Sequence, residues 1–346
     1  VRNMPIIPGV LVLNSNQIYG KVKDKYLYKC VPDDKRLPSF LVPYKLRIEF
    51  TKKKTNKYIV FKHNFWEDKH PQGSIVSVLG DVEELESFYE YQLYCKSLYA
   101  SIQQFTKVAM KKLKENTERE YLMSMVEKYD LTDRTSEYVF TIDSEQTTDY
   151  DDALSVKQIN YEVPSYKVSI YIANVSMWME ELSLWDSFSE RIATIYLPDR
   201  KRPMLPTILS ECMCSLGAGS IRMALSLDLT IMDNEIIAYD FKNTYVNVKD
   251  NHSYGSDKLL KNKDYQLLLL LMQNLSRNSQ YSYTTEIKNS FDLVSYSMIL
   301  MNYYAACEMT KYKNGIYRSV TINKSVVIPT NLPSSITGFL THWHSS

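Results

Sequence analysis

Short apolar segments separated by turn residues mark the first part of the chain. Five such segments are rich in aliphatic or aromatic side chains: residues 10–13, 19–22, 26–31, 57–62 and 74–79. Strands that recur every 8–12 positions or so, with turn residues between them, are typical of a small β-barrel. The pattern therefore predicts a barrel over residues 1–82.

The apolar residues then change to a helical period. Leu85, Phe88 and Tyr89 recur at helical spacing, and a second helical pattern covers residues 102–114. Charged residues occupy most of the remaining positions. The pattern predicts a charged helical connector over residues 83–135.

Strands and helices mix over residues 136–346. Three strands are predicted from apolar segments: 138–142, 167–175 and 222–232. The last alternates apolar and polar residues, as a half-buried strand does. Three helices are predicted: 185–195, one that begins near Ser256, and one that Ser290 caps and that ends near Lys311. The predicted fold class is therefore α+β, with a barrel, a helical connector and a mixed α/β domain.

Charge and cysteine usage narrow the class of protein. Lys and Arg total 41 against 40 Asp and Glu, and a net charge of +1 argues against a protein that coats a polyanion. A local basic groove for RNA stays compatible with this balance. The five scattered cysteines predict reduced thiols in an intracellular, cytoplasmic protein, with the nucleus as a second option. No run of about 18 apolar residues occurs, so no membrane span is predicted.

Four aspartates are the sharpest chemical feature: Asp143, Asp149, Asp151 and Asp152, directly after an apolar strand. Carboxylates this close raise one another's pKa, so a buried cluster requires a compensating cation. Oxygen ligands without His or Cys suit Mg²⁺ or Mn²⁺. Two such ions about 4 Å apart can activate water and stabilise the leaving oxygen of a phosphodiester. The cluster thus indicates metal-assisted hydrolysis of a phosphodiester.

A solvated acidic loop and a calcium-binding loop are the alternatives for this cluster. A calcium loop of the EF-hand type requires Gly at its sixth position and Glu at its twelfth. Counted from Asp143, these positions hold Thr148 and Leu154, so the calcium pattern fails. Cys212 and Cys214 could form half of another metal site, but no second Cys or His pair accompanies them.

The residues around the aspartates resemble the signature of the ribonuclease II/ribonuclease R (RNB) superfamily, which includes the exosome's catalytic exoribonuclease. The resemblance begins at residues 142–156 and continues in order through further blocks: 171–176, 196–198, 203–206, 209–216, 222–226, 253–254 and 315–318. Residues 71–85 are similar to the end of the family's second cold-shock barrel. Several separate blocks in one order make the resemblance specific.

This resemblance implies a fold, an activity and a set of ligands. The fold would be a cold-shock/OB-type barrel, a helical connector and an RNB-type catalytic domain at residues 136–346. The activity would be 3′-to-5′ hydrolysis of single-stranded RNA to nucleoside 5′-monophosphates. The four aspartates would bind two Mg²⁺ ions, with Mn²⁺ as a substitute. An RNA-degradation complex is a candidate partner, and no membrane is implied.

Aromatic and basic side chains would hold the RNA. By resemblance, Tyr196 and Tyr254 would stack on the 3′-terminal nucleotides, and stacking contributes about 1–3 kcal/mol per base. In the barrel, Lys57, Tyr58 and Trp66 belong to a mixture of cations and aromatic rings that suits single-stranded RNA. Its other members are Lys52, Lys53, Lys54, Lys62, Lys69, Phe61 and Phe65. Ordinary packing is the alternative for each, because the chain contains 28 tyrosines and many lysines.

Three departures from the family pattern favour a second interpretation. Asn174 stands where the family usually has Asp, and Ser295 and Tyr296 stand where it usually has two glutamates. The chain ends shortly after residues 342–345, which resemble the start of the family's arginine-bearing motif, so we expect a fragment cut within the catalytic domain. The second interpretation is a catalytically impaired RNA-binding or scaffold protein of the same fold. The four retained aspartates oppose it.

Overall fold

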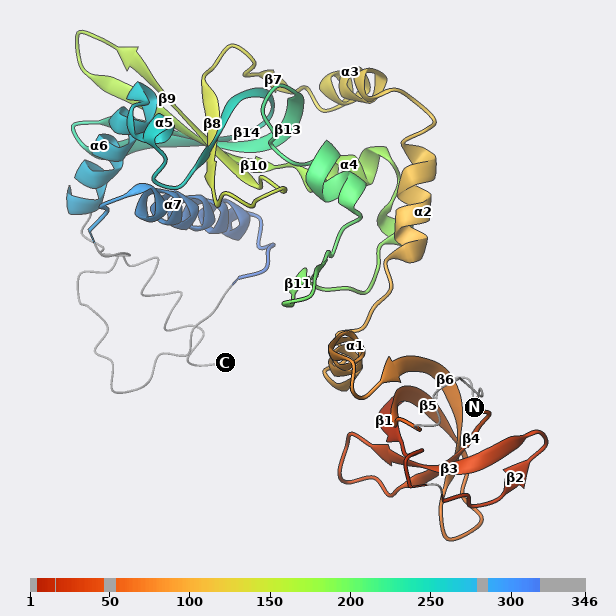
Figure 1. Ribbon diagram of the computed structural model, residues 1–346. Helices are drawn as coiled ribbons and strands as arrows, with labels where there is room; N and C mark the ends of the chain where they lie inside the picture. The colour runs from red at the N-terminus through yellow and green to blue at the C-terminus, as the bar shows by residue number, and fades with distance from the viewer. Residues whose placement is uncertain (1–4, 16, 47–53, 279–285, 318–346) are drawn as a thin grey trace. The chain divides into compact units, whose positions relative to one another are not determined.

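The computed structural model describes residues 5–15, 17–46, 54–278 and 286–317. The chain divides into two compact units (Figure 1). Unit 1 consists of Val1–Thr106 and Ser187–Leu205, and unit 2 consists of Lys107–Asp186 and Pro206–Ser346. Each unit has a six-stranded sheet and a hydrophobic core of its own.

Unit 1 is built on a small barrel, as the sequence predicted. Its strands are β1 (Ile7–Leu11), β2 (Lys21–Val22), β3 (Lys25–Pro32), β4 (Phe40–Tyr44), β5 (Lys57–Phe65) and β6 (Gln72–Asp81). They follow the order β1-β5-β6-β4-β3-β2, and β1 also pairs with β3. This extra pairing closes five strands into a ring, the arrangement of an OB-type barrel. The ring encloses apolar side chains such as Leu11, Val42 and Ile59, which are fully buried.

A helix and a short hairpin complete unit 1. Helix α1 (Leu85–Cys95) packs on the barrel through Tyr91, whose ring stacks on Tyr58 with centroids 4.3 Å apart. The hairpin consists of β11 (Ile195–Tyr196) and β12 (Lys201–Arg202). Helix α2 (Gln103–Lys112) begins in unit 1 and ends in unit 2.

Unit 2 is a mixed α/β domain around a second curved sheet. Its strands are β7 (Thr132–Asp133), β8 (Val139–Asp143), β9 (Asp152–Asn160), β10 (Ser165–Ala173), β13 (Ile221–Met232) and β14 (Glu235–Ser253). They follow the order β13-β10-β9-β8-β14-β7, and β13 also pairs with β14. The pairing of β13 with β14 therefore closes β13, β10, β9, β8 and β14 into a ring. The sequence predicted β8, β10 and β13 to within two residues at each end.

Five helices and a π-helical turn surround this sheet. They are α3 (Glu118–Lys128), α4 (Val175–Glu181), the turn Ile208–Met213, α5 (Asp257–Leu260), α6 (Lys263–Asn278) and α7 (Ser290–Lys311). Helices α6 and α7 lie against the sheet (Figure 1) and bury Leu268, Met272 and Leu293 with the strand residues Phe140 and Leu227. No helix in the described ranges combines the length and apolar character required to cross a membrane.

The predicted helix at 185–195 is wrong. Only a single 3₁₀ turn forms at Trp185–Ser187, and Ile195 already belongs to β11. Two contacts explain the irregular backbone: Phe188 packs edge-on against Phe105, and Arg191 donates hydrogen bonds to the carbonyl oxygens of Ala100 and Pro203. The Arg191 contacts satisfy backbone acceptors of other segments, and neither contact follows from a local period of the sequence.

Two predicted helix starts are also corrected. The cap of α7 is Asn289, not Ser290, because the Asn289 side chain accepts hydrogen bonds from the backbone N–H groups of Phe291 and Asp292. The helix predicted from near Ser256 is interrupted after one turn, since α5 ends at Leu260. Helix α6 then begins anew, with the Asn262 side chain accepting from the N–H of Tyr265.

Candidate active site

The four aspartates lie at one end of the β8–β9 pair. Asp143 is the last residue of β8 and Asp152 is the first residue of β9, and residues 144–151 connect them. The two strands run antiparallel, with Phe140 opposite Leu154. An antiparallel connection returns the chain to the edge it left. Asp143 and Asp152 therefore lie at the same edge of the sheet, and Asp149 and Asp151 lie in the loop above it.

Backbone hydrogen bonds fix this acidic loop to two distant segments. The Leu216 N–H donates to the Tyr150 carbonyl at 2.9 Å, and the Tyr150 N–H donates to Ser215 Oγ at 3.0 Å. The Ala173 N–H donates to the Asp151 carbonyl at 2.9 Å. The segments around Ala173 and Leu216, which are distant in sequence, thus meet at the acidic loop. Their hydrogen bonds fix the backbone that carries its carboxylates.

Strand β14 brings an aromatic ring to the same edge. Ser253 pairs with Asp143 in parallel register, and the Tyr254 N–H donates to the Asp143 carbonyl at 2.9 Å. Burial raises the pKa of Tyr254, and the charges of Asp143 and Asp152 raise it further. The Tyr254 phenol therefore lies within electrostatic reach of both carboxylates.

Phe291 is a candidate site residue that the sequence analysis missed. Its ring lies 5.7 Å from that of Tyr254 at an interplanar angle of 58°, and 62% of its surface is exposed. The Gly255 N–H donates to Ser290 Oγ at 3.2 Å, which holds the first turn of α7 beside Tyr254. The two rings come from segments more than thirty residues apart, so no spacing pattern could have paired them.

The carboxylates of Asp143 and Asp152 are electrostatically strained. Burial raises the pKa of Asp152 to about 7, and the charges of Asp143 and Asp151 add to this shift. Burial also raises the pKa of Asp143 to about 6, helped by the charges of Asp151 and Asp149 and opposed by a hydrogen bond from Thr141. Asp143 Oδ2 is buried without a hydrogen-bond partner among the described residues. A cation would satisfy this oxygen and lower both pKa values.

The four aspartates have the ligand type that a hard cation prefers, but their side chains are not close enough together to hold one. Within the described ranges, no three His, Cys, Asp or Glu side chains are gathered closely enough to hold a metal ion. The donor set is nevertheless entirely carboxylate oxygen, which suits Mg²⁺ or Mn²⁺. Its half-buried members carry the raised pKa values and the unpartnered oxygen. The metal site thus stays a prediction that the electrostatics favour.

We expect the free energy of unfolding of the metal-free protein to fall as the pH rises from about 4 to about 8. Asp143 and Asp152 keep their protons in the folded state up to pKa values of about 6 and about 7, whereas the unfolded chain loses them near pH 4. Ionisation of the unfolded state therefore removes stability over this window, by roughly 3–7 kcal/mol. Urea unfolding in EDTA at several pH values measures the slope.

The variant Asp152→Asn tests the origin of this slope. It should unfold with a weaker pH dependence and be more stable than the parent at pH 8 without metal, because its side chain never ionises. Added Mg²⁺ should stabilise the parent at pH 8 more than the variant. Glu162→Gln in the exposed β9–β10 turn is the matched control and should retain the full slope. Equal slopes in all three proteins would contradict the assignment.

The remaining predicted RNA-binding residues lie in unit 1. Tyr196, on β11, is 71% exposed, and Trp66, at the end of β5, is 59% exposed, so both rings can accept a base. Tyr58 is instead stacked on Tyr91, and Lys57 forms an ion pair with Asp81. Both therefore contribute to the packing of the barrel.

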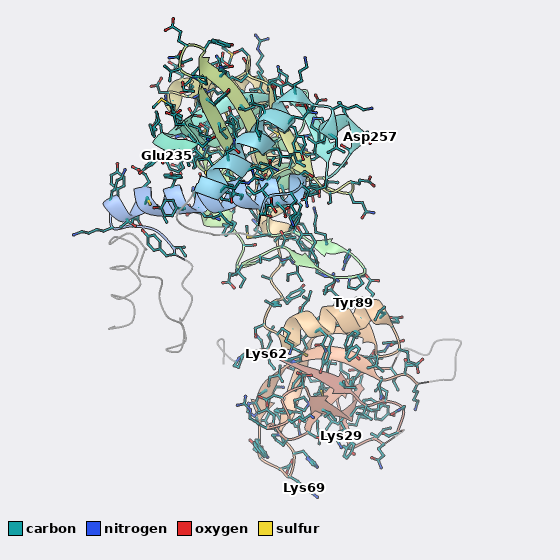
Figure 2. All side chains as sticks on the ribbon, turned by 90° about the vertical axis from the view of Figure 1, so that its left-hand side faces the viewer. Lys29, Lys62, Lys69, Tyr89, Glu235 and Asp257 are labelled. Atoms are coloured by element: carbon teal, nitrogen blue, oxygen red, sulfur yellow. The ribbon has the colours of Figure 1, made fainter. Side chains whose placement is uncertain are left out.

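The other members of the barrel's cation–aromatic mixture divide in the same way. Phe61 is fully buried in the barrel core, so the prediction that it contacts RNA is wrong. Lys62 and Lys69 are carried by the barrel (Figure 2), and Lys69 is exposed. Lys52 and Lys53 lie outside the described residues.

The departures from the family pattern have structural roles of their own. Asn174 caps α4: its Oδ1 accepts from the Met177 N–H at 3.2 Å and from Ser176 Oγ at 2.8 Å. Tyr296 is 4% exposed in the core between α7 and the sheet, and Ser295 is half-buried. Residues 342–345 lie outside the described residues.

Two segments of the chain match known domain families. Residues 130–280 match the RNB domain, and residues 27–91 match the Dis3-like cold-shock domain 2. The resemblance to the RNB superfamily is therefore confirmed. So is the fold class, with a cold-shock/OB-type barrel, helices and an RNB-type α/β domain.

Curated relatives match part of the chain. It is 29% identical over 188 residues to ribonuclease R of Thermotoga maritima, which covers 54% of this chain and 26% of that protein. It is 38% identical over 118 residues to exoribonuclease 2 of Vibrio parahaemolyticus, which covers 34% of this chain and 17% of that protein. The chain thus spans about a quarter or less of the length of these relatives.

Solved structures share the fold. Mycoplasma genitalium RNase R, in complex with ribose-methylated single-stranded RNA, is similar with a TM-score of 0.67 and 18% identity, over 90% of this chain and 52% of that chain. Yeast Ssd1, a pseudonuclease, is similar with a TM-score of 0.58 and 15% identity, over 90% of this chain and 41% of that chain. The same architecture therefore occurs in a ribonuclease R and in a pseudonuclease.

Proposed function

Because this chain carries an RNB domain preceded by a Dis3-like cold-shock domain 2, we propose that it acts as a 3′-to-5′ exoribonuclease on single-stranded RNA. The products would be nucleoside 5′-monophosphates. One observation carries the proposal: Asp143, Asp152 and Tyr254 lie at one edge of the sheet, where the Tyr254 N–H donates to the Asp143 carbonyl at 2.9 Å. Burial raises the pKa of Tyr254, and the charges of the two carboxylates raise it further. The carboxylates that could bind metal ions and the ring that could stack on a base thus lie at the same edge of the sheet.

We assign the binding of two Mg²⁺ ions, or of Mn²⁺, to Asp143, Asp149, Asp151 and Asp152. The bound ions would supply Lewis-acid activation of the attacking water and offset charge on the leaving oxygen. The fixed backbone of the acidic loop keeps the carboxylates oriented before RNA arrives, which reduces the reorganisation that the reaction requires. Asp143 and Asp152 are half-buried, so their carboxylates would hold the ions partly shielded from water.

The Tyr254–Phe291 pair would hold the base of a terminal nucleotide. A tilted pair of exposed or half-exposed rings offers an apolar face that accepts any base, since stacking is tolerant of sequence. In unit 1, Trp66 and Tyr196 would contact RNA in the same manner. The predicted cytoplasmic location and the RNA-degradation complex stay predictions.

We expect Phe291→Ala to raise the KM for single-stranded RNA by about 5- to 30-fold, which corresponds to about 1–2 kcal/mol of lost stacking. Its stability should change little, because the side chain is largely exposed. Phe291→Tyr is the matched control, since it keeps the ring, and should bind as the parent does. Steady-state kinetics on a short oligoribonucleotide measure both. A Phe291→Ala protein with the parental KM would show that this ring does not contact the RNA.

A catalytically impaired RNA-binding relative is the second candidate. Ser295 and Tyr296, at positions where the family resemblance implies glutamates, favour it, and so does the similarity to a pseudonuclease. This candidate predicts tight RNA binding without cleavage. The two candidates therefore differ in one measurable property.

Degradation of a 5′-labelled single-stranded RNA, with and without Mg²⁺, separates the candidates. The full natural protein should shorten the RNA stepwise from its 3′ end only when Mg²⁺ is present, and should release 5′-monophosphates. Binding without shortening would favour the impaired relative. Internal cuts would contradict an exonuclease.

A further inference from the structure

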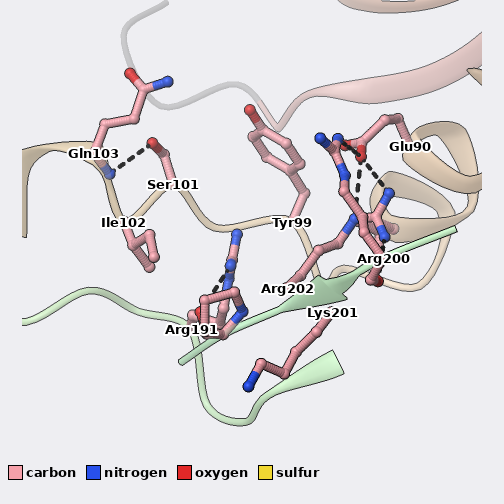
Figure 3. Close-up of a pocket in the computed structure, with 11 residues that line it drawn as sticks. Glu90, Tyr99, Ser101, Ile102, Gln103, Arg191, Arg200, Lys201 and Arg202 are labelled. Atoms are coloured by element: carbon pink, nitrogen blue, oxygen red, sulfur yellow. Dashed lines mark hydrogen bonds and ion pairs between the residues drawn. The ribbon is translucent and has the colours of Figure 1, made fainter. Parts of the chain in front are cut away.

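A cavity of about 280 Å³ lies within unit 1, which contains none of the four aspartates. It is bordered by α1, by the segment that connects α1 to α2, and by the β11–β12 hairpin (Figure 3). Four cationic side chains line it: Arg191, Arg200, Lys201 and Arg202. Glu90 is the only carboxylate among the lining residues, so the cavity wall is cationic.

The carboxylates nearby are already occupied by two of these arginines. Arg202 donates to Glu90 at 2.6 Å and to Asp199 at 2.8 Å, and its side chain is only 6% exposed. Arg200 donates to the same Glu90 oxygen at 3.0 Å. Figure 3 shows both guanidinium groups gathered around Glu90. Glu90 therefore serves two arginines, and Glu86 and Asp199 lie 3.7 Å and 3.8 Å from Arg200.

Arg191 is the cation that this network leaves out. It donates to the carbonyl oxygens of Pro203 at 2.9 Å and Ala100 at 2.5 Å, and it has no carboxylate partner among the described residues. Its Nε–H is buried and unpartnered there. In Figure 3 it stands apart from the cluster around Glu90. A half-buried guanidinium that bonds only neutral carbonyls among the described residues keeps an uncompensated charge, which favours an anionic ligand.

The cavity also offers an aromatic edge. Tyr99 lines it, is 44% exposed, and stacks on Tyr94 with ring centroids 4.0 Å apart and an interplanar angle of 17°. The stacked pair holds the Tyr99 ring rigidly. A guanidinium fork beside a fixed aromatic ring suits a phosphate that is attached to a sugar and base.

We propose that this cavity binds the phosphate group of a nucleotide, with Arg191 as its principal donor and Arg200 as a second cation at its mouth. The phosphate can belong to a nucleoside monophosphate or to the backbone of an RNA strand. Arg191 and Arg200 flank Tyr196 in sequence, so an occupied cavity would also steady the hairpin that carries Tyr196. This site is separate from the hydrolytic one and does not depend on RNA cleavage.

Isothermal titration of the full natural protein in EDTA tests the proposal with three probes: inorganic phosphate, AMP and a five-nucleotide oligoribonucleotide. EDTA removes metal-dependent hydrolysis, so a failure of the nuclease proposal leaves this test intact. We expect Arg191→Met to weaken AMP binding at least tenfold and Arg200→Gln to weaken it about threefold. Arg36→Gln, at an exposed arginine of the same unit, should bind as the parent does.

The pattern across probes identifies the source of the phosphate. Binding of AMP and phosphate that weakens in both variants supports a monophosphate site, and weakening confined to the oligoribonucleotide supports an RNA backbone site. Arg191→Met could disturb the hairpin, because its side chain bonds two backbone carbonyls. Arg200→Gln tests the site without this risk, since the Arg200 side chain is 56% exposed and its loss should leave the fold intact. A parent that binds none of the three probes would overturn the proposal, and so would unchanged binding of all probes in Arg200→Gln.

Discussion

Asp151→Asn is expected to lose Mg²⁺-dependent RNA hydrolysis by at least about 1,000-fold, which corresponds to about 4 kcal/mol of transition-state stabilisation. Asp151 is exposed at the acidic loop, its backbone is held by Ala173, and its charge raises the pKa of both Asp143 and Asp152. The amide retains the shape of the side chain but removes a negative charge from the proposed metal ligands. RNA binding should persist, because the stacking rings are unaffected.

The measurement is the rate of shortening of 5′-labelled RNA by the full natural protein and its variant. Glu145→Gln is the matched control, because it removes the same charge from the same loop at an exposed side chain. Its rate should stay within about twofold of the parent, well under 1 kcal/mol. Equal losses in both variants would show that the loop acts through its total charge. An unchanged rate in Asp151→Asn would remove this residue from the site.

Arg134→Met is expected to lower the free energy of unfolding by about 3–5 kcal/mol. The Arg134 guanidinium is buried and donates to Asp228 at 2.5 Å and to Glu137 at 2.8 Å. Asp228 lies on β13 and also accepts a hydrogen bond from Ser169 Oγ, at 2.6 Å. The substitution therefore leaves a buried carboxylate without its cation, in the middle of the sheet that positions the acidic loop.

Urea denaturation measures this loss, and a second variant separates charge from packing. Arg134→Met with Asp228→Leu removes both charges and should recover much of the stability, because a buried pair can be replaced by apolar side chains of similar size. Arg277→Met breaks an exposed pair with Glu286 and should cost less than about 1 kcal/mol. A loss in Arg134→Met no larger than in Arg277→Met would show that the buried network contributes little.

Local patterns were sufficient for the strands that alternate or are uniformly apolar. The prediction for residues 222–232 differs from β13 by one residue, because alternate apolar side chains such as Leu227 and Leu229 face the core. The predicted half-burial is wrong, since the polar side chains between them, Ser226 and Asp228, are also buried. The crowding of four aspartates after β8 is also a local property, and it marked the acidic loop without any knowledge of the fold. The family resemblance then supplied the order of the domains.

Strand β14 shows where local patterns failed. It runs for 19 residues, yet no strand was predicted there, because much of it is exposed and carries Lys, Asp and Asn side chains. Its conformation follows from pairing with β13 on one side and with β8 on the other. Such pairing is made by backbone groups, and the side-chain pattern does not record it.

The sequence by itself determined the class of fold, the acidic loop and the chemistry that oxygen ligands favour, since each depends on residues close together in the chain. Only the tertiary structure decided which side chains are available to a ligand. It buried Phe61, paired Lys57 with Asp81, brought Phe291 to Tyr254 and gave Arg191 backbone carbonyls as acceptors. Burial and pairing join residues from distant segments, so they are set by the packing of the whole unit and not by any local spacing.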